Sequence, residues 1–268
     1  MKLGFIGTGN MAGAIIKGFV NKNCVNSSDI YFIRQNKEKQ AQQASELGIN
    51  GCNDYESLIE NSDILFLGVK PVVFPTLLPQ IAKSVKKKNP LVVSMAAGLT
   101  TDSIKEMLGY DAKIIRIMPN VNAAIAMSTT AVCKNEFASD EDLATIKNLF
   151  SSIGLTTEVP ENQFAIFTAI AGCSPAYVYM FIDGLARGAQ KMGMNKQKAL
   201  EIAASAVIGS ASMYAQSNEH PQELVDKVCS PGGTTIEGVT TLEEYKFTAG
   251  VVKAVENSIL KDRELSKK

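Results

Sequence analysis

The first half of the chain alternates short apolar runs with amphipathic stretches. The apolar runs have the length and composition of buried strands and lie at 2–6, 30–33, 64–69, 91–94 and 114–118. The stretches between them follow the helical period and lie at 11–21, 37–47, 73–85 and 103–108. This alternation is typical of parallel strands whose two faces are covered by helices. A strand at 129–133, a helix at 140–153 and a strand at 156–159 are expected to complete the sheet.

The second half is helical throughout. Helical patterns follow one another at 164–171, 175–192, 196–216, 221–228 and 236–265. Pro160, with Glu161-Asn162 behind it, marks the expected boundary between domain 1–160 and domain 161–268. The predicted fold class is therefore α/β, with an N-terminal doubly wound sheet followed by an all-helical C-terminal domain. These helices carry more apolar surface than a small monomer usually hides, which indicates a subunit interface.

Composition narrows the function further. The chain has 27 Lys and Arg residues and 27 Asp and Glu residues, so it has no net charge that would attract it to nucleic acid or to an anionic membrane. Five scattered cysteines and a single histidine, His220, speak against a disulfide framework, a metal site and a histidine-based triad. A strand that starts at residue 2 leaves no room for a signal peptide, and no apolar run is expected to reach membrane-spanning length. A cytoplasmic protein is expected.

A glycine-rich turn follows the first predicted strand and precedes a helix. It reads Gly7-Thr8-Gly9-Asn10-Met11-Ala12, the G-x-G-x-x-A pattern of a dinucleotide-binding, Rossmann-type domain. Gly7 permits the tight turn, Gly9 lets the backbone approach a pyrophosphate, and Ala12 allows close packing of helix on strand. A purely structural turn is the alternative, and the position between strand and helix favours the binding role.

The end of the second predicted strand indicates which dinucleotide binds. Sites that prefer NAD carry an acid there, whereas this chain has Ile33-Arg34-Gln35-Asn36-Lys37. The planar guanidinium of Arg34 can bind a 2′-phosphate and Lys37 can add positive charge. NADPH is the expected cofactor, with NADH as a second choice. The alternative is a solvated loop that happens to hold two basic residues.

A second glycine-rich segment lies late in the chain. Gly232-Gly233 precedes Thr234-x-x-Glu237, a pattern that predicts a capping box and the start of a helix. The first turn of a helix offers unpaired N–H donors to a carboxylate, and Thr235 would lie beside it with its hydroxyl to spare. Spacing alone favours the simpler alternative, a capped helix after a turn.

The amino-acid sequence of this segment resembles that of a known protein family. The run Val228-Cys-Ser-Pro-Gly-Gly-Thr-Thr-Ile-Glu-Gly-Val239 closely resembles the signature of the pyrroline-5-carboxylate reductases. Five further stretches agree in the same order: Gly7-Thr-Gly-Asn-Met11, Val69-Lys-Pro71, Ser94-Met-Ala-Ala-Gly98, Arg116-Ile-Met-Pro-Asn120 and Ser174-Pro-Ala-Tyr177. The resemblance implies reduction of the C=N bond of L-1-pyrroline-5-carboxylate to L-proline by hydride from NAD(P)H, the last step of proline biosynthesis.

The resemblance also implies roles for individual residues. The implied cofactor-binding residues are Ile6, Gly7, Thr8, Gly9, Asn10, Met11, Arg34, Asn36, Val69, Lys70, Pro71, Ala96, Ala97, Gly98 and Asn120. The implied substrate-binding residues are Ser230, Gly232, Gly233, Thr234 and Thr235, and Thr235 is the implied catalytic donor to the imine nitrogen. The implied partners are a small cyclic imino acid and a second subunit, in a homodimer or a higher assembly of dimers. Each active site would combine the cofactor domain of one subunit with helices of its neighbour.

Two other functions fit parts of the sequence. The β-hydroxyacid dehydrogenases share the opening motif and use a lysine and an asparagine four residues apart, a spacing that Lys191 and Asn195 reproduce. A dinucleotide-sensing regulator could use the same fold without catalysis. The absence of base candidates disfavours alcohol oxidation, and a regulator has no need of an intact segment at 232–235.

Overall fold

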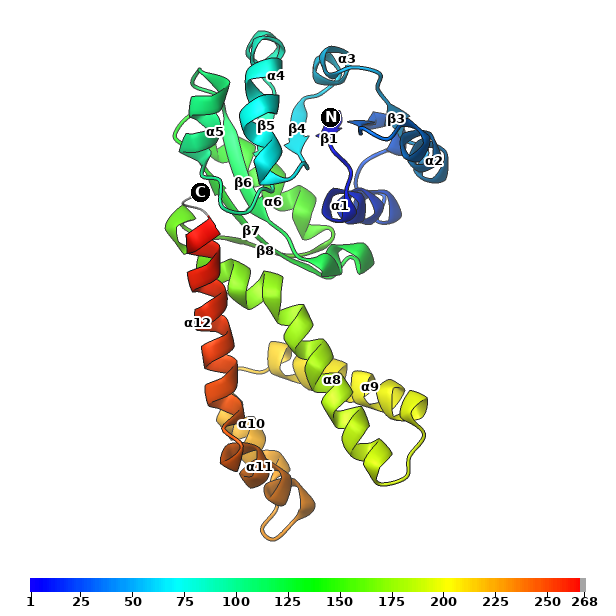
Figure 1. Cartoon of the computed structure of the whole chain (residues 1–268), viewed down its shortest axis with the longest axis vertical. Helices are drawn as coiled ribbons and strands as arrows, with labels where there is room; N and C mark the ends of the chain where they lie inside the picture. Colours follow the sequence, from blue (N-terminus) through cyan, green and yellow to red (C-terminus); the bar gives the residue numbers. More distant parts are fainter. Residues whose placement is uncertain (266–268) are drawn as a thin grey trace. The chain divides into compact units, whose positions relative to one another are not determined.

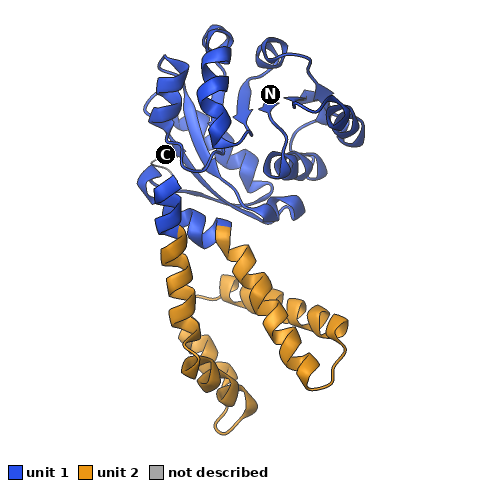
Figure 2. Cartoon of the chain, in the orientation of Figure 1, with its two compact units in different colours: residues 1–172, 259–268 blue, residues 173–258 orange. Residues whose placement is uncertain are grey.

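The computed structural model describes residues 1–265. The chain forms two compact units (Figure 2). The first comprises Met1–Gly172 together with the chain from Ile259 onward, and the second comprises Cys173–Ser258.

The first unit is built on one eight-stranded sheet with the order β3-β2-β1-β4-β5-β6-β7-β8. The strands are β1 (Leu3–Ile6), β2 (Ile30–Ile33), β3 (Asn50–Gly51), β4 (Ile64–Leu67), β5 (Leu91–Ser94), β6 (Ile114–Met118), β7 (Ser128–Lys134) and β8 (Gly154–Glu158). All neighbours pair in parallel except β6 and β7. Only a short 3₁₀ turn, Val121–Ile125, lies in the connection between these two strands. That connection lacks the helical crossover that a parallel pair usually needs, so β7 runs back beside β6.

Helices cover both faces of the sheet (Figure 1). On one face α1 (Asn10–Asn21) and α6 (Asp140–Ser151) share a core with alternate strand residues such as Phe5 and Phe66, whose rings stack at 4.5 Å. On the other face α3 (Tyr55–Glu60), α4 (Phe74–Lys88) and α5 (Thr101–Leu108) pack on the remaining strand residues. The helix α2 (Lys37–Leu47) follows β2. Burial of both strand faces explains why β1, β2, β4, β5 and β6 are almost continuously apolar.

A buried arginine ties the segment after Pro160 to the sheet. Arg116 on β6 is 5% exposed, and its Nη1 lies 3.2 Å from Oε1 of Glu161. The same carboxylate accepts hydrogen bonds from the N–H and the hydroxyl of Thr101 at the start of α5, at 2.8 and 3.0 Å. The guanidinium also lies 4.6 Å from the ring centre of Phe164. Residues 161–172 therefore group with the first unit, although the domain boundary expected from the sequence is at residue 160.

Helices make up the rest of the chain. A 3₁₀ turn (Glu161–Gln163), α7 (Phe164–Phe167) and a π-helical segment (Thr168–Cys173) lead into α8 (Ser174–Lys191). They are followed by α9 (Lys196–Gln216), α10 (Pro221–Val228), α11 (Thr234–Glu244) and α12 (Phe247–Leu265). The single helix expected at 236–265 is wrong, because Lys246 adopts a left-handed φ of 57° and separates α11 from α12.

Very few residues of the second unit are buried. Four residues of the whole span α8–α12 are buried: Pro175, Ala186, Ala199 and Ala203. The unit is held by the packing of α8 on α9 and by two contacts from α8 to α12. The Tyr177 hydroxyl lies 2.7 Å from the Ser258 hydroxyl, and the rings of Phe181 and Phe247 are 5.9 Å apart.

Large apolar side chains cover the surface of these helices. Exposed examples are Met180, Met192, Ile208, Met213 and Tyr245. One helical stretch among the described residues, Glu161–Lys191, is long and apolar enough to cross a membrane by length and composition alone. The expectation that no apolar stretch reaches this length is therefore wrong. Polar residues such as Thr168, Ser174 and Asp183 interrupt the stretch, yet its average hydropathy remains apolar.

Candidate active site

The first glycine turn brings three backbone segments together. Gly7 has a φ of 85°, and a Cβ on it would lie 2.7 Å from Val69 Cγ1. A Cβ on Gly68, which follows β4, would lie 2.4 Å from the Gly7 carbonyl oxygen and 2.9 Å from the Ala12 Cβ. These contacts leave no room for a side chain at either glycine. They hold the start of α1 close against the ends of β1 and β4, as expected for Ala12 in the sequence motif.

The start of α1 is open toward solvent. Gly9 is its N-cap in extended conformation, no side chain caps the helix, and its first turn contains no acidic residue. A Cβ built on Gly9 would meet no atom within 4 Å. The N–H groups of the first turn therefore stay accessible, and together with the positive end of the helix dipole they suit a phosphate.

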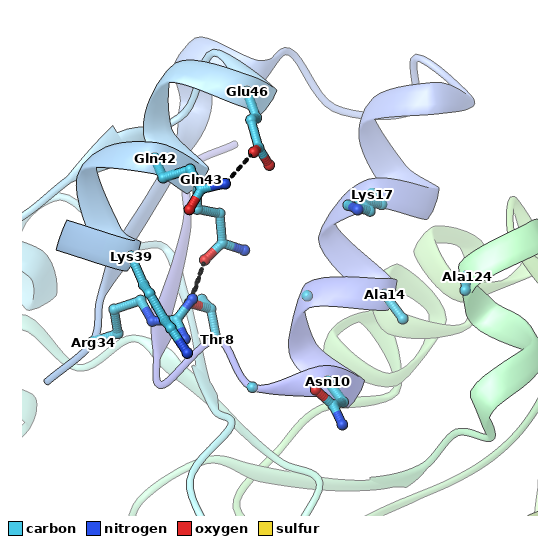
Figure 3. A pocket seen from close by; sticks show the side chains of 12 residues that line it. Thr8, Asn10, Ala14, Lys17, Arg34, Lys39, Gln42, Gln43, Glu46 and Ala124 are labelled. Atoms are coloured by element: carbon cyan, nitrogen blue, oxygen red, sulfur yellow. Dashed lines mark hydrogen bonds between the residues drawn. The ribbon is translucent and has the colours of Figure 1, made fainter. Parts of the chain in front are cut away.

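A cavity of about 440 Å³ opens beside this helix start (Figure 3). It is lined by Thr8, Gly9, Asn10, Gly13, Ala14, Lys17, Arg34, Lys39, Gln42, Gln43, Glu46 and Ala124. Three cations and one carboxylate give this lining a formal charge of +2. A concave surface with that charge beside an uncapped helix fits a dinucleotide with an additional phosphate.

Arg34 is held at both its backbone and its side chain. Its main-chain N–H donates to Gln40 Oε1 at 2.9 Å, and its Nη1 donates to Gln43 Oε1 at 3.1 Å. Gln40 is itself buried and donates to the Cys52 carbonyl at 2.8 Å. The guanidinium therefore lines the cavity in a defined position (Figure 3).

The basic neighbours of Arg34 differ from those expected. Lys37 does not line the cavity, because its Nζ lies 3.4 Å from the Asn53 carbonyl. Lys39 and Lys17 take that place instead. The sequence held a signal for Lys39, since positions 39, 42, 43 and 46 follow the i, i+3, i+4, i+7 spacing of one helix face. Asn36 caps α2 by accepting the Lys39 N–H at 2.8 Å.

The other expected cofactor residues lie at the carboxyl ends of neighbouring strands. Ile6 is buried and Met11 packs partly against the core, so they can offer a ligand mainly their backbone. Lys70 and Pro71 are exposed after β4, where Val69 packs against the core. After β5, Ala96 is buried, Ala97 is exposed and Gly98 has a φ of 79°.

Asn120 follows β6 and is 4% exposed. Its Nδ2 donates to the Ala171 carbonyl at 3.0 Å, and its Oδ1 accepts the Thr129 N–H at 3.2 Å. Its side chain therefore joins β7 to the π-helical segment. One amide hydrogen and one lone pair are left for any further contact.

In the second unit the segment before α11 forms a tight turn. The Gly233 N–H donates to the Ser230 carbonyl at 3.0 Å, and Gly232 has a left-handed φ of 66°. A Cβ on Gly233 would lie 2.5 Å from Ser230 Oγ. Gly233 is the N-cap of α11, and no side chain caps this helix. The capping box expected at Thr234 is therefore wrong, because Thr234 already belongs to the first turn.

This turn leaves donors available. Thr235 is the second residue of α11 and is exposed, and within residues 1–265 its hydroxyl has no hydrogen-bond partner. The first N–H groups of α11 are uncapped for the same reason as those of α1. The turn therefore offers several N–H groups and one hydroxyl to a small anion.

The lysine and asparagine of the rival dehydrogenase pattern do not share a helix. Lys191 is the last residue of α8, and Gly193 with a φ of 98° turns the chain after it. Asn195 is the N-cap of α9, where its side chain accepts the Lys198 N–H at 3.2 Å. The side chain of Asn195 is thus used to start a helix.

Reactive side chains are scarce in the described part of the chain. No cluster of three His, Cys, Asp or Glu residues there could hold a metal ion. Burial raises the pKa of the Cys133 thiol to about 12, so this cysteine stays protonated and is no nucleophile. The chemistry that these sites support is binding, orientation and hydrogen-bond donation.

Comparison with known proteins gives the family. A family model described as pyrroline-5-carboxylate reductase dimerisation matches residues 161–265. The pyrroline-5-carboxylate reductase of Escherichia coli (strain K12) is 40% identical over 266 residues, which cover 99% of this chain and 98% of that protein. The chain belongs to the pyrroline-5-carboxylate reductase family.

Solved structures agree with this assignment. The pyrroline-5-carboxylate reductase of Streptococcus pyogenes is 38% identical, with a TM-score of 0.89 over 98% of each chain. The Plasmodium falciparum pyrroline carboxylate reductase, solved with NADP bound, is 30% identical, with a TM-score of 0.90 over 99% of this chain and 98% of the other. A second family model, described as NADP oxidoreductase, coenzyme F420-dependent, matches residues 2–98. The predicted fold class of this reductase-family chain is confirmed.

Proposed function

We propose that the protein reduces the C=N bond of L-1-pyrroline-5-carboxylate to give L-proline, using NADPH in preference to NADH. The observation that carries this proposal is the turn at Ser230–Thr235 in a member of this family, where uncapped N–H groups lie beside a hydroxyl that has no hydrogen-bond partner among residues 1–265. Those groups match a substrate that presents a carboxylate beside a ring nitrogen.

The cofactor part of the proposal rests on the cavity beside α1. NADPH, when bound, supplies the hydride. The N–H groups at the start of α1 would hold the pyrophosphate, and Arg34 and Lys39 would hold the 2′-phosphate. The ends of β4, β5 and β6, with Val69–Pro71, Ala96–Gly98 and Asn120, would border the rest of the cofactor.

The substrate part needs few groups. A cyclic imine that arrives as an iminium is already electrophilic, so no base has to be supplied. The N–H groups near Gly233 and Thr234, with Ser230 and Gly232 shaping the turn, would bind the carboxylate. Thr235 would donate its O–H to the ring nitrogen and so orient the C=N bond for hydride transfer.

A direct assay tests the reaction. Purified protein is expected to oxidise NADPH faster with L-1-pyrroline-5-carboxylate than with six-membered piperideine carboxylates, because the extra ring methylene displaces the C=N carbon from the hydride donor while the carboxylate and the nitrogen are held. Product analysis should identify proline. Equal or greater turnover of the six-membered imines would reject the proposed substrate, and NADPH binding without turnover of either would favour a regulator.

We also propose a homodimer, or an assembly of dimers, in the cytoplasm. The match to a dimerisation domain supports oligomerisation, and the near absence of buried residues in α8–α12 requires a covering surface. A second copy provides the same apolar helices and can bury them. We infer that a second copy, and no lipid or nucleic acid, covers this surface.

Light scattering at assay concentration is expected to show at least a dimer. Dilution to monomers should abolish activity. It should also make α8–α12 less compact, because the apolar surface of these helices would then be exposed to water. A fully active monomer would contradict the shared-site arrangement.

A further inference from the structure

The Gln43 side chain links the glycine turn to the end of β2. Its Oε1 accepts two hydrogen bonds, one from Thr8 Oγ1 at 2.7 Å and one from Arg34 Nη1 at 3.1 Å. Thr8 is 4% exposed, so its hydroxyl depends on this partner. Arg34 is fixed from the other side by Gln40, which accepts its main-chain N–H. One amide oxygen thus determines where the guanidinium points.

The partners of Arg34 are neutral. Within residues 1–265 no carboxylate forms an ion pair with Arg34 or with Lys39. The one acid of the cavity, Glu46, accepts a hydrogen bond from Gln42 Nε2 at 2.7 Å (Figure 3). Arg34 is therefore held in position while its charge stays available to a ligand.

The side chain at position 43 determines whether Arg34 is only oriented or is also neutralised. An amide oxygen orients a guanidinium without cancelling its charge, whereas a carboxylate would orient it and also neutralise it. A carboxylate there would in addition repel a dianionic phosphate and could accept a ribose hydroxyl, as the acid of NAD-preferring sites does.

We propose that Gln43 is a specificity-determining residue of the cofactor site, which positions Arg34 and preserves its charge for a ribose 2′-phosphate. The inference rests on the proposed function, in which the cavity beside α1 binds NADPH. Neither the glycine motif nor the basic end of β2 contains Gln43; the assignment comes from its two hydrogen bonds and from the absence of a competing carboxylate in the described chain.

The test compares two variants that add the same charge to the same cavity. Gln43→Glu places a carboxylate against Arg34, and Gln42→Glu places one a single position earlier, where the side chain is hydrogen-bonded to Glu46 and not to Arg34. For Gln43→Glu, the ratio of kcat/KM with NADPH to that with NADH should fall tenfold or more, because a charged phosphate contact is worth about 1.5–3 kcal/mol. For Gln42→Glu the ratio should fall less than threefold. Arg34→Asp, the positive control, should shift the preference toward NADH at least as far.

Binding measurements separate this inference from the reaction. Calorimetry should show that Gln43→Glu lowers the affinity for adenosine 2′,5′-diphosphate about tenfold. The affinity for ADP, which has no 2′-phosphate, should not change. Gln43→Leu, which removes the acceptor and adds no charge, should show a smaller loss. If the protein fails to reduce any imine while these binding results hold, the proposed function falls and the role of Gln43 stands. Equal losses in Gln43→Glu and Gln42→Glu, or an unchanged preference in Gln43→Glu, would overturn it.

Discussion

Replacing Thr235 with alanine is expected to lower kcat/KM for imine reduction about ten- to a thousandfold. This is the range for removing a neutral or charge-assisted donor that acts in the transition state. The hydroxyl has no partner within the described chain, so its removal leaves no buried group unsatisfied and stability should not change. The loss should not be total, because a substrate that arrives protonated brings its own proton, and lower pH should restore part of the rate. Steady-state kinetics across neutral pH, with NADPH binding measured separately, check this.

Thr234→Ala is the matched control. Thr234 lies one position earlier in the same turn of α11 and makes no capping hydrogen bond, so this change should leave stability unaffected and cost less activity. Thr235→Ser keeps the hydroxyl and should recover most of the rate. If Thr235→Ala turns over substrate like the unaltered protein at every pH, the proposed donor role is wrong.

Replacing Glu161 with alanine is expected to destabilise the first unit by about 1.5–3 kcal/mol. The change removes the carboxylate that hydrogen-bonds the buried Arg116, and a hydrogen bond to a charged group is worth about that much, while the negative charge of Asp262 still offsets part of the charge of Arg116. It also removes the acceptor for the Thr101 N–H at the start of α5. Denaturant unfolding followed by near-ultraviolet circular dichroism measures the loss.

Two comparisons isolate the cause. Glu161→Gln keeps one oxygen for the Thr101 N–H but loses the charge and the second oxygen, which accepts the Thr101 hydroxyl, so its cost should lie between that of alanine and zero. Glu158→Ala breaks a nearby ion pair with Lys147 in which both side chains are exposed, and it should cost less than about 1 kcal/mol. A loss at Glu161→Ala no larger than that at Glu158→Ala would show that the Arg116 pair does not stabilise the unit.

The sheet was largely predictable because its strands are buried on both faces. The bounds of β2, β5 and β6 match the apolar runs, since burial on both sides leaves few polar positions inside a strand, here Ser94 and Arg116. The two-residue β3 and the six-residue α3 were missed, because neither is long enough to show a period. The break between α11 and α12 was also missed, since a lysine with positive φ carries no sequence signal comparable to glycine.

The candidate site was predictable where a backbone conformation requires a particular residue. The glycines at positions 7 and 232 adopt left-handed conformations, and the motifs contain them for that reason. Side chains that reach a site from a helix face were harder to predict: the sequence shows that Lys39 and Gln43 share one face of α2, but not that this face lies beside α1. The sequence at the end of β2 suggested Lys37 instead, but the Lys37 ammonium group donates to the Asn53 carbonyl.

The division of the chain into units has a consequence for synthesis. The first unit includes the chain from Ile259 onward, so the helical unit is an insertion within it. A ribosome releases residues in order, and domains generally fold as they emerge. Here the sheet can form early, but its unit is complete only after the last turns of α12 have been made. A chain cut short before Ile259 should therefore leave its first unit unfinished as well as its second, and truncation at the C-terminus should impair folding of the dinucleotide-binding half.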